Sequence, residues 1–239
     1  MPAEPKKTQR SKQPKAAAKM ADAPRRVRIL VSSVVHGYAD FLESVYAILE
    51  EYGYEVVMSH RGTVPINPDI SAMSSCEEAV DGCDIFLGII LPRYGSGREE
   101  GNPYSITHRE TIRAIERNKP RWFLVHEHVV IARDLLSPYR DENKLYDESK
   151  RPSYVLKEGI KFQATPYLQD LRVLGLYELA MRHDKAQVRD RKGNWVQPFG
   201  TDEDARLFAT TQFRRYREIE QRYLPKLKPL ATPALRRPA

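Results

Sequence analysis

Hydrophobic and polar positions follow two periods along this chain. Short apolar runs rich in β-branched and aromatic residues, typical of strands buried in a parallel sheet, alternate with stretches whose apolar residues recur every three or four positions and predict amphipathic helices. The strongest strand signal is the uninterrupted run Asp84–Leu91. The predicted strands are 27–31, 54–58, 84–91 and 121–125, and the predicted helices are 38–52, 70–82, 105–118 and 129–136. This alternation predicts an α/β fold with a doubly wound parallel sheet of four to five strands.

The pattern weakens after residue 140. The predicted elements there are an exposed charged loop at 141–153, a short fifth strand at 160–163, a helix at 167–181 and a turn at 189–195. Residues 202–224 predict one long amphipathic helix. Its apolar stripe consists of Leu207, Phe208, Phe213, Tyr216, Ile219 and Tyr223. We therefore expect an α/β domain at 27–140 and a mostly helical C-terminal extension at 141–224 that packs on it.

The positive charge of the chain is concentrated at its two ends. The formal net charge is +7, but residues 1–26 carry +6, residues 225–239 carry +4, and the remainder is −3. Residues 1–26 contain almost no large apolar side chain, which predicts a disordered basic tail, and residues 225–239 predict a second, proline-rich tail. A folded nucleic-acid-binding domain would carry its positive charge on the fold, so we expect nucleic acid to bind only weakly, through the tails.

Cysteine usage and hydropathy indicate the expected compartment. Cys76 and Cys83 are too few for a disulfide framework or a four-cysteine zinc site and suit a reducing compartment. The chain has no apolar run of about 18 residues that would span a membrane and no apolar signal-peptide core. The sequence thus predicts a cytoplasmic protein with no membrane partner and no metal site.

Familiar catalytic motifs are absent from the sequence. Gly95 and Gly97 are followed by Glu100 where the dinucleotide fingerprint requires its third glycine. The chain has no Gly-Lys-Ser/Thr phosphate loop and no Gly-x-Ser-x-Gly nucleophile elbow. The pair His126 and His128 lacks the spacing of the zinc-protease pattern. Any chemistry must therefore depend on a carboxylate together with binding groups.

Such a carboxylate follows the strongest strand. The run Asp84–Leu91 leads into a loop with Arg93, Tyr94 and two glycines, and then into a helix that begins near Ser105 and carries Glu110. Open α/β sheets bind their ligands at the carboxyl ends of the strands. The loop and the first turns of this helix therefore lie where a binding site is expected.

The order of these motifs resembles a known family. A strand ending in Ser32 and Ser33, then CDIFLGII-x-x-RYGS, then a helix with a Ser/Thr-x-x-Glu start, is similar to a TIR-like family catalogued as a domain of unknown function. That family is usually found at the N-terminus of signalling or defence proteins. The likeness covers about residues 27–136. More distantly, the layout resembles TIR domains and nucleoside deoxyribosyltransferases, which share a flavodoxin-like sheet and a glutamate that cleaves an N-glycosidic bond.

The resemblance implies a role for each candidate residue. Glu110 matches the catalytic glutamate of these groups. The other candidates are expected to bind the substrate, NAD or a related nucleotide, with no separate cofactor. They are Ser32, Ser33, His36, Arg93, Tyr94, Ser105 and His126. The sequence departs from the family at His36-Gly37-Tyr38, where an acidic helix start is expected, and at His108-Arg109 before the glutamate.

Each candidate also has a structural interpretation. Glu110 could merely stabilise the start of its helix, and Arg93 could form a surface ion pair with Glu99 or Glu100. Tyr94 could be a packing residue, the two serines could terminate a strand, and His126 could be a satisfied histidine at the rim.

Three functions are compatible with the sequence. The first is a TIR-like effector that cleaves the N-glycosidic bond of NAD or a related nucleotide through Glu110, in bacterial antiviral defence or stress signalling. The second is a non-enzymatic module that assembles with itself or with a protein partner through the apolar stripe of 202–224. The third is a nucleoside-processing transferase.

Overall fold

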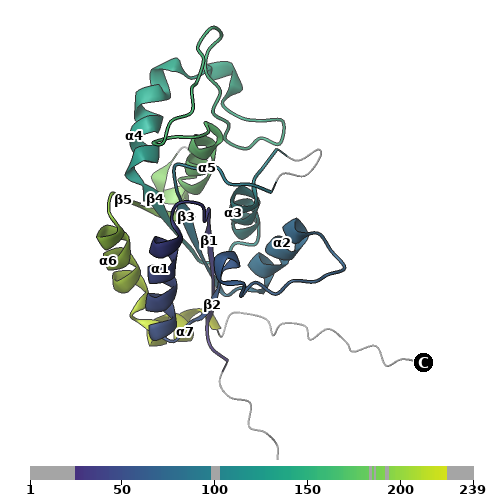
Figure 1. The fold of residues 1–239 in the computed structure, drawn as a ribbon, viewed down its shortest axis with the longest axis vertical. Helices are drawn as coiled ribbons and strands as arrows, with labels where there is room; N and C mark the ends of the chain where they lie inside the picture. Colours follow the sequence, from purple (N-terminus) through teal and green to yellow (C-terminus); the bar gives the residue numbers. More distant parts are fainter. Residues whose placement is uncertain (1–24, 98–102, 183–184, 186, 192–193, 225–239) are drawn as a thin grey trace, which may run out of the picture.

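A five-stranded parallel sheet forms the centre of the molecule (Figure 1). The computed structural model describes residues 25–97, 103–182, 185, 187–191 and 194–224. The strands are β1 (Arg28–Ser33), β2 (Glu55–Val57), β3 (Ile85–Ile90), β4 (Arg121–His126) and β5 (Asn194–Phe199). The helices are α1 (Ala39–Glu51), α2 (Ala72–Gly82), α3 (Ile106–Glu116), α4 (Glu127–Leu136), α5 (Arg172–Ala180), α6 (Asp202–Phe213) and α7 (Tyr216–Tyr223).

The sheet order is β2-β1-β3-β4-β5, and all neighbouring strands are parallel. The predicted doubly wound α/β fold is thus confirmed, and the order is that of flavodoxin-like folds. Strand β3 lies at the centre with every residue buried, as its uninterrupted apolar run predicted. Its one glycine, Gly88, is needed because a Cβ there would lie 2.5 Å from the ring of Phe123 on β4.

Helices cover both faces of the sheet and form two hydrophobic clusters. Helices α1 and α6 cover one face, and α2 and α3 cover the other (Figure 1). Side chains of α1, α6, α7 and β5 join the first cluster: Phe41, Leu42, Val45, Leu49, Phe199, Phe208, Phe213 and Ile219. Side chains of α2, α3, α4 and α5 join the second: Ala79, Val80, Ala114, Val129, Val173 and Leu174. The segment after residue 140 therefore supplies a strand and helices to the same sheet and cores.

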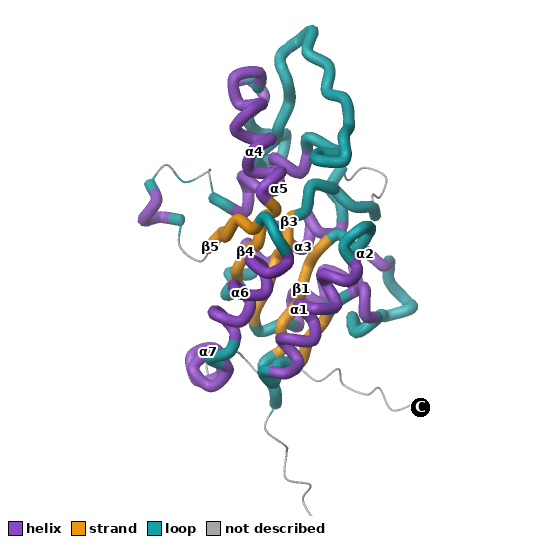
Figure 2. Tube along the Cα trace, turned by 60° about the vertical axis from the view of Figure 1, so that its left-hand side comes forward, coloured by secondary structure: helices purple, strands orange, loops and turns teal. Residues whose placement is uncertain are grey.

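The fifth strand lies elsewhere than predicted. Residues 160–163 form no strand and belong to the long loop region beside α4 and α5 (Figure 2). Instead Asn194–Phe199, part of which was expected to be a turn, pairs with β4 as the edge strand β5. Pro198 is compatible with a strand at this position, because one side of an edge strand's backbone has no pairing partner.

Two helices predicted in the C-terminal segment are shorter in the structure than expected. The helix expected at 167–181 begins only at Arg172, whose backbone N–H donates to the Asp170 side chain. The long helix expected at 202–224 is interrupted at Arg215, which has a non-helical ψ of 49°, so it divides into α6 and α7. Most of its stripe faces the first hydrophobic cluster, whereas Leu207 is exposed. This stripe is therefore core and does not serve as the docking face expected for the assembly module.

The strand order reverses direction between β1 and β3. The chain proceeds from β1 to β2 on one side and from β3 to β5 on the other. At such a switch point the loops after the two strands diverge and leave a crevice outside their carboxyl ends. The loops after Ser33 and Ile90 border this crevice.

Candidate functional site

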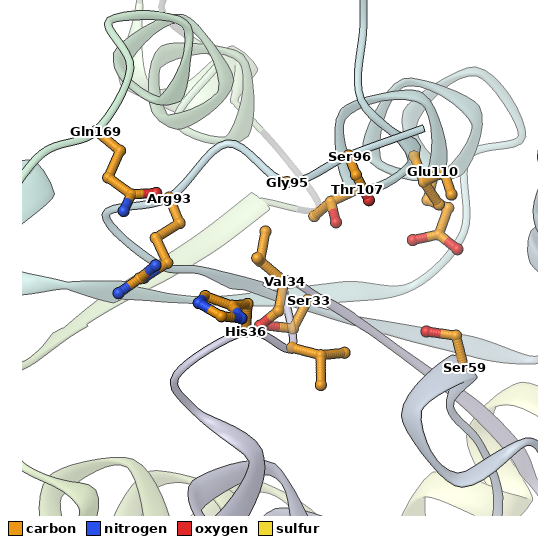
Figure 3. A pocket seen from close by; sticks show the side chains of 12 residues that line it. Ser33, Val34, His36, Ser59, Arg93, Gly95, Ser96, Thr107, Glu110 and Gln169 are labelled. Carbon is orange, nitrogen blue, oxygen red and sulfur yellow. The ribbon is translucent and has the colours of Figure 1, made fainter. Parts of the chain in front are cut away.

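A pocket of about 430 Å³ opens at this switch point. Figure 3 shows Glu110 at one end of the pocket, Arg93 and Gln169 at the other, and Ser33 and His36 between them. Its lining residues are Ser33, Val34, Val35, His36, Ser59, Arg93, Gly95, Ser96, Ile106, Thr107, Glu110 and Gln169. Segments far apart in the chain thus meet around one cavity, whose volume lies within the range of small-molecule sites, about 300–1,000 Å³.

The loop between β3 and α3 forms one wall of the pocket. Gly95 and Gly97 both have a φ of +83°, which glycine adopts without steric cost, and they turn the chain from the strand back to the helix. Helix α3 then begins with Ser105 as its N-cap, because the Ser105 side chain accepts a hydrogen bond from the His108 backbone N–H. This start places Glu110 in the second turn of α3.

Glu110 is the buried carboxylate of the site. It is 5 % exposed, and its Oε2 accepts a hydrogen bond of 2.5 Å from Ser32 Oγ. The Cys76 thiol on α2 also hydrogen-bonds to it. No Lys or Arg among the described residues forms an ion pair with Glu110. The helix-capping alternative does not describe this residue, since its side-chain hydrogen bonds go to Ser32 on β1 and Cys76 on α2.

Burial changes the ionisation of this pair of side chains. Desolvation raises the pKa of Glu110 to about 7, although the hydrogen bonds from Ser32 and Cys76 oppose the rise. Desolvation, and then the neighbouring Glu110 charge, raises the pKa of Cys76 to about 11. Cys76 is therefore a thiol that donates its hydrogen bond at neutral pH, and Glu110 exchanges its proton near neutrality.

This titration predicts a pH-dependent stability. A glutamate has a pKa of about 4.3 in the unfolded chain, so between about pH 4.5 and 7 the folded state binds more protons, and the free energy of unfolding falls as pH rises. The loss at Glu110 is about 3 kcal/mol, since each pKa unit corresponds to about 1.4 kcal/mol. Glu110→Gln removes this contribution.

Urea unfolding of both proteins at pH 5 and pH 8 measures the effect. We expect the free energy of unfolding of Glu110→Gln, relative to the unsubstituted protein, to increase by about 3 kcal/mol between these pH values. Other titrating groups cancel in this comparison. A constant difference would contradict the raised pKa.

Arg93 provides positive charge at the other end of the pocket. Its guanidinium lies beside Gly37, where a Cβ would be 3.4 Å from Nη2. It forms no hydrogen bond or ion pair with another described residue. The two glutamates considered as its partners, Glu99 and Glu100, lie outside the described residues. A half-buried guanidinium that forms no ion pair with another described residue is suited to bind an anionic group of a ligand.

Ser33 and His36 line the pocket as expected, whereas Ser32 acts indirectly. Ser32 is buried and bonds to Glu110, so it orients the carboxylate and is not part of the lining. The lining also contains Ser59, Thr107 and Gln169, which were not predicted from the sequence. Thr107 had a usable signal, because it lies three residues before Glu110 on the same helical face.

Tyr94 and Ser105 do not belong to this pocket. Tyr94 is 3 % exposed, and its hydroxyl lies 2.8 Å from His108 Nδ1. Ser105 is fully buried as the helix cap. Adjacent residues of one loop point to opposite sides, so Tyr94 packs on the far side of the loop from Arg93.

His126 is also separate from the pocket lining. It is the N-cap of α4, where its Nδ1 accepts a hydrogen bond of 3.2 Å from the His128 backbone N–H. Its ring contacts the rings of Tyr38 and Phe199. Desolvation lowers the pKa of His126, with the neighbouring His128 acting in the same direction. His126 is thus a satisfied rim histidine.

Within the part of the chain that the structure describes, no group of three or more His, Cys, Asp or Glu side chains is arranged to hold a metal ion. In the same ranges, no helix has the length and apolar character needed to cross a bilayer.

Comparison with known proteins identifies the family of the chain. No curated protein matches the chain. The family described as "Domain of unknown function (DUF4062)" matches residues 28–161, which include β1, β3, α3 and most of the pocket lining. Because this match covers more than half of the 239 residues, the chain belongs to the DUF4062 family.

Proposed function

We propose that this protein binds NAD or a related nucleotide in the pocket and cleaves its N-glycosidic bond with Glu110. One observation carries the proposal: Ser33, Arg93 and Glu110 come from three distant segments and line the same cavity. The likeness to TIR domains and nucleoside deoxyribosyltransferases supports the same reaction. In those groups a glutamate on the helix after the third strand performs the cleavage.

A buried carboxylate suits this chemistry. When the bond between C1′ of the ribose and the ring nitrogen breaks, its electron pair leaves with the base, and the sugar acquires oxocarbenium character. The Glu110 carboxylate stabilises this positive charge or attacks C1′ to form an ester. Water then adds to C1′ and loses its proton. Nicotinamide departs as a neutral molecule, because its nitrogen is positively charged while attached, and needs no general acid.

The remaining lining groups have binding roles in this proposal. Arg93 would bind a phosphate, because a guanidinium donates to phosphate oxygens in a fixed fork. The hydroxyls of Ser33, Ser59 and Thr107 would hold the ribose. Ser32 and Cys76 would keep the carboxylate in place by their hydrogen bonds.

Release of nicotinamide tests the proposal. The full chain is incubated with NAD at several protein concentrations, and nicotinamide is quantified by chromatography. We expect release that depends on protein concentration and on an intact Glu110. If no nicotinamide is released and calorimetry detects no NAD binding, NAD is not the substrate of this protein. Exchange of the base when a free nucleoside is supplied would instead favour the transferase.

The cellular setting belongs to the proposal too. Cys76 and Cys83 are buried free thiols, which suits a reducing compartment such as the cytoplasm. Families with this architecture occur in signalling and defence proteins, so the activity is proposed to serve bacterial antiviral defence or stress signalling. This last step depends on analogy at the level of the fold.

A second candidate function, self-association, is favoured by an apolar groove of about 420 Å³ on α4. Ile131, Leu135 and Tyr167 line it and are each more than half exposed. Exposed apolar side chains gathered in one place often mark an interface. Sedimentation equilibrium should then show an oligomer that Leu135→Asp converts to monomers; a monomeric unsubstituted protein would exclude this function.

A further inference from the structure

The end of the pocket opposite Glu110 includes a residue that the family match does not cover. Gln169 lines the pocket, although the match ends at residue 161. The Gln169 backbone N–H donates to the Pro92 carbonyl at 3.0 Å, so Gln169 lies beside the start of the β3–α3 loop, next to Arg93. Figure 3 shows the side chains of Gln169 and Arg93 at this end of the pocket. The segment after the matched region therefore contributes to the site.

The position of Gln169 is fixed by its two neighbours in the chain. Leu168, directly before it, is buried in the second hydrophobic cluster. Asp170, directly after it, forms an ion pair with Arg172, whose guanidinium lies 4.4 Å from the centre of the Tyr94 ring. The Gln169 side chain itself is exposed. The fold therefore holds the backbone at this point, and a substitution of the side chain should leave the structure intact.

The side chains of Gln169 and Arg93 both have hydrogen-bond donors available to a ligand. Neither side chain forms a hydrogen bond with another described residue. A guanidinium has five N–H donors and a primary amide has two. Among the described residues that line the pocket, Glu110 is the only carboxylate, and it lies at the opposite end (Figure 3). Grouped donors with a positive charge and no neighbouring carboxylate favour an anionic group of the ligand.

The anionic group follows from the ligand class. This step rests on the proposed function, in which the ligand is NAD or a related nucleotide and its negative charge lies on phosphate. The phosphate is attached to C5′, on the other side of the ribose from C1′. A nucleotide with C1′ beside Glu110 can therefore extend its phosphate past Ser33 toward Arg93 (Figure 3). A nucleoside has no phosphate and leaves the donors at this end without an anionic acceptor.

We propose that Arg93 and Gln169 form a phosphate subsite, and that Gln169 is a specificity-determining residue by which the pocket selects nucleotides over nucleosides. The guanidinium supplies the charge and a fork of donors, and the Gln169 amide NH₂ donates to a further phosphate oxygen. Neither group touches the glycosidic bond, so both contribute to substrate binding and not to the cleavage step.

Nicotinamide mononucleotide and nicotinamide riboside are the probes, because they share the glycosidic bond and differ only in the 5′-phosphate. For the full chain we expect kcat/KM to be at least about tenfold higher for the mononucleotide, since a hydrogen bond to a charged group contributes about that factor. Gln169→Ala should lower kcat/KM for the mononucleotide by about five- to tenfold, through KM, and change the riboside value by less than about twofold.

Gln163→Ala is the matched control. Gln163 is an exposed glutamine of the same segment and does not line the pocket, so this substitution should change kcat/KM for neither probe. Equal kcat/KM values for the two probes in the unsubstituted protein would refute the phosphate subsite. An equal loss for both probes in Gln169→Ala would refute the specificity role of Gln169. The comparison of the two probes decides the question of the subsite even if a variant fails to fold.

Calorimetric binding of the same two probes separates this inference from the proposed cleavage. If the mononucleotide binds more tightly than the riboside, with an affinity that falls in Gln169→Ala, but is not cleaved, the subsite is supported and the proposed cleavage is wrong. If both probes are cleaved without preference, the cleavage is supported and the subsite is wrong. Failure of the mononucleotide to bind at millimolar concentration would also refute the subsite.

Discussion

Replacing Glu110 by glutamine is expected to lower the rate of nicotinamide release from NAD by a factor of at least about 10²–10³, the usual cost of removing a group that stabilises transition-state charge. Glutamine keeps the shape and can still accept the Ser32 hydrogen bond, so the fold should persist. It carries no negative charge to stabilise the oxocarbenium-like sugar. The loss should therefore appear in kcat and leave NAD binding by calorimetry within a few-fold.

Glu116→Gln is the matched control. Glu116 is on the same helix, pairs with Arg151 at the surface and does not line the pocket. Its release rate should equal that of the unsubstituted protein. Because burial raises the pKa of Glu110 to about 7 and the ionised form is the reactive one, the rate should also increase between about pH 6 and 8. Equal rates for Glu110→Gln and Glu116→Gln would refute a catalytic role.

Replacing Phe213 by alanine is expected to destabilise the protein by about 3–5 kcal/mol, as for other buried aromatic residues. Phe213 is fully buried, with its ring centre 5.3 Å from that of Trp122 and 5.9 Å from that of Tyr54. Its backbone carbonyl accepts from the Tyr54 hydroxyl. Truncation leaves a cavity between α6 and the sheet. Urea unfolding measures the change.

Leu207→Ala on the same helix is the control for this substitution. Leu207 is 68 % exposed, so its truncation should change the free energy of unfolding by no more than about 0.5 kcal/mol. A small effect at Phe213 would mean that α6 is detachable and that its stripe is free for docking. The large effect would confirm that the C-terminal segment completes the core.

The elements between residues 27 and 136 could be predicted because their signals are local. A run such as Ile85–Ile90 has no polar position and must be buried on both faces, whereas the spacing of Phe41, Leu42, Val45 and Leu49 suits only one face of a helix. Glycine and proline mark the ends of these elements. Each observed strand and helix in this part lies within a few residues of its prediction.

Strand β5 could not be predicted in the same way. Asn194–Phe199 contains an exposed tryptophan and a proline, and becomes a strand by pairing with β4, more than 60 residues earlier. Residues 160–163 have the better local pattern but obtain no such partner. An edge strand is determined by its neighbour's backbone, which no local window contains.

The candidate site likewise has features that could be predicted from the sequence and features that could not. Glu110 and Arg93 were predictable because the loop and helix after a central parallel strand lie at the ligand-binding edge. The direction in which each side chain points could not be predicted from the sequence. Tyr94 differs from Arg93 by one position and faces a different cavity. The link between Glu110 and Cys76 joins α3 to α2, and no spacing in the sequence predicts it.

The sequence by itself determined the layered α/β architecture and the position of Glu110 on the helix after the third strand, because hydrophobic periodicity and glycine placement act within one element. Only the tertiary structure decided which segment completes the sheet, that Glu110 is buried and bonded to Ser32, and that Arg93 and Ser33 share its pocket. These properties depend on contacts between segments distant in the chain. Desolvation, which raises the Glu110 pKa, arises only when those segments pack together.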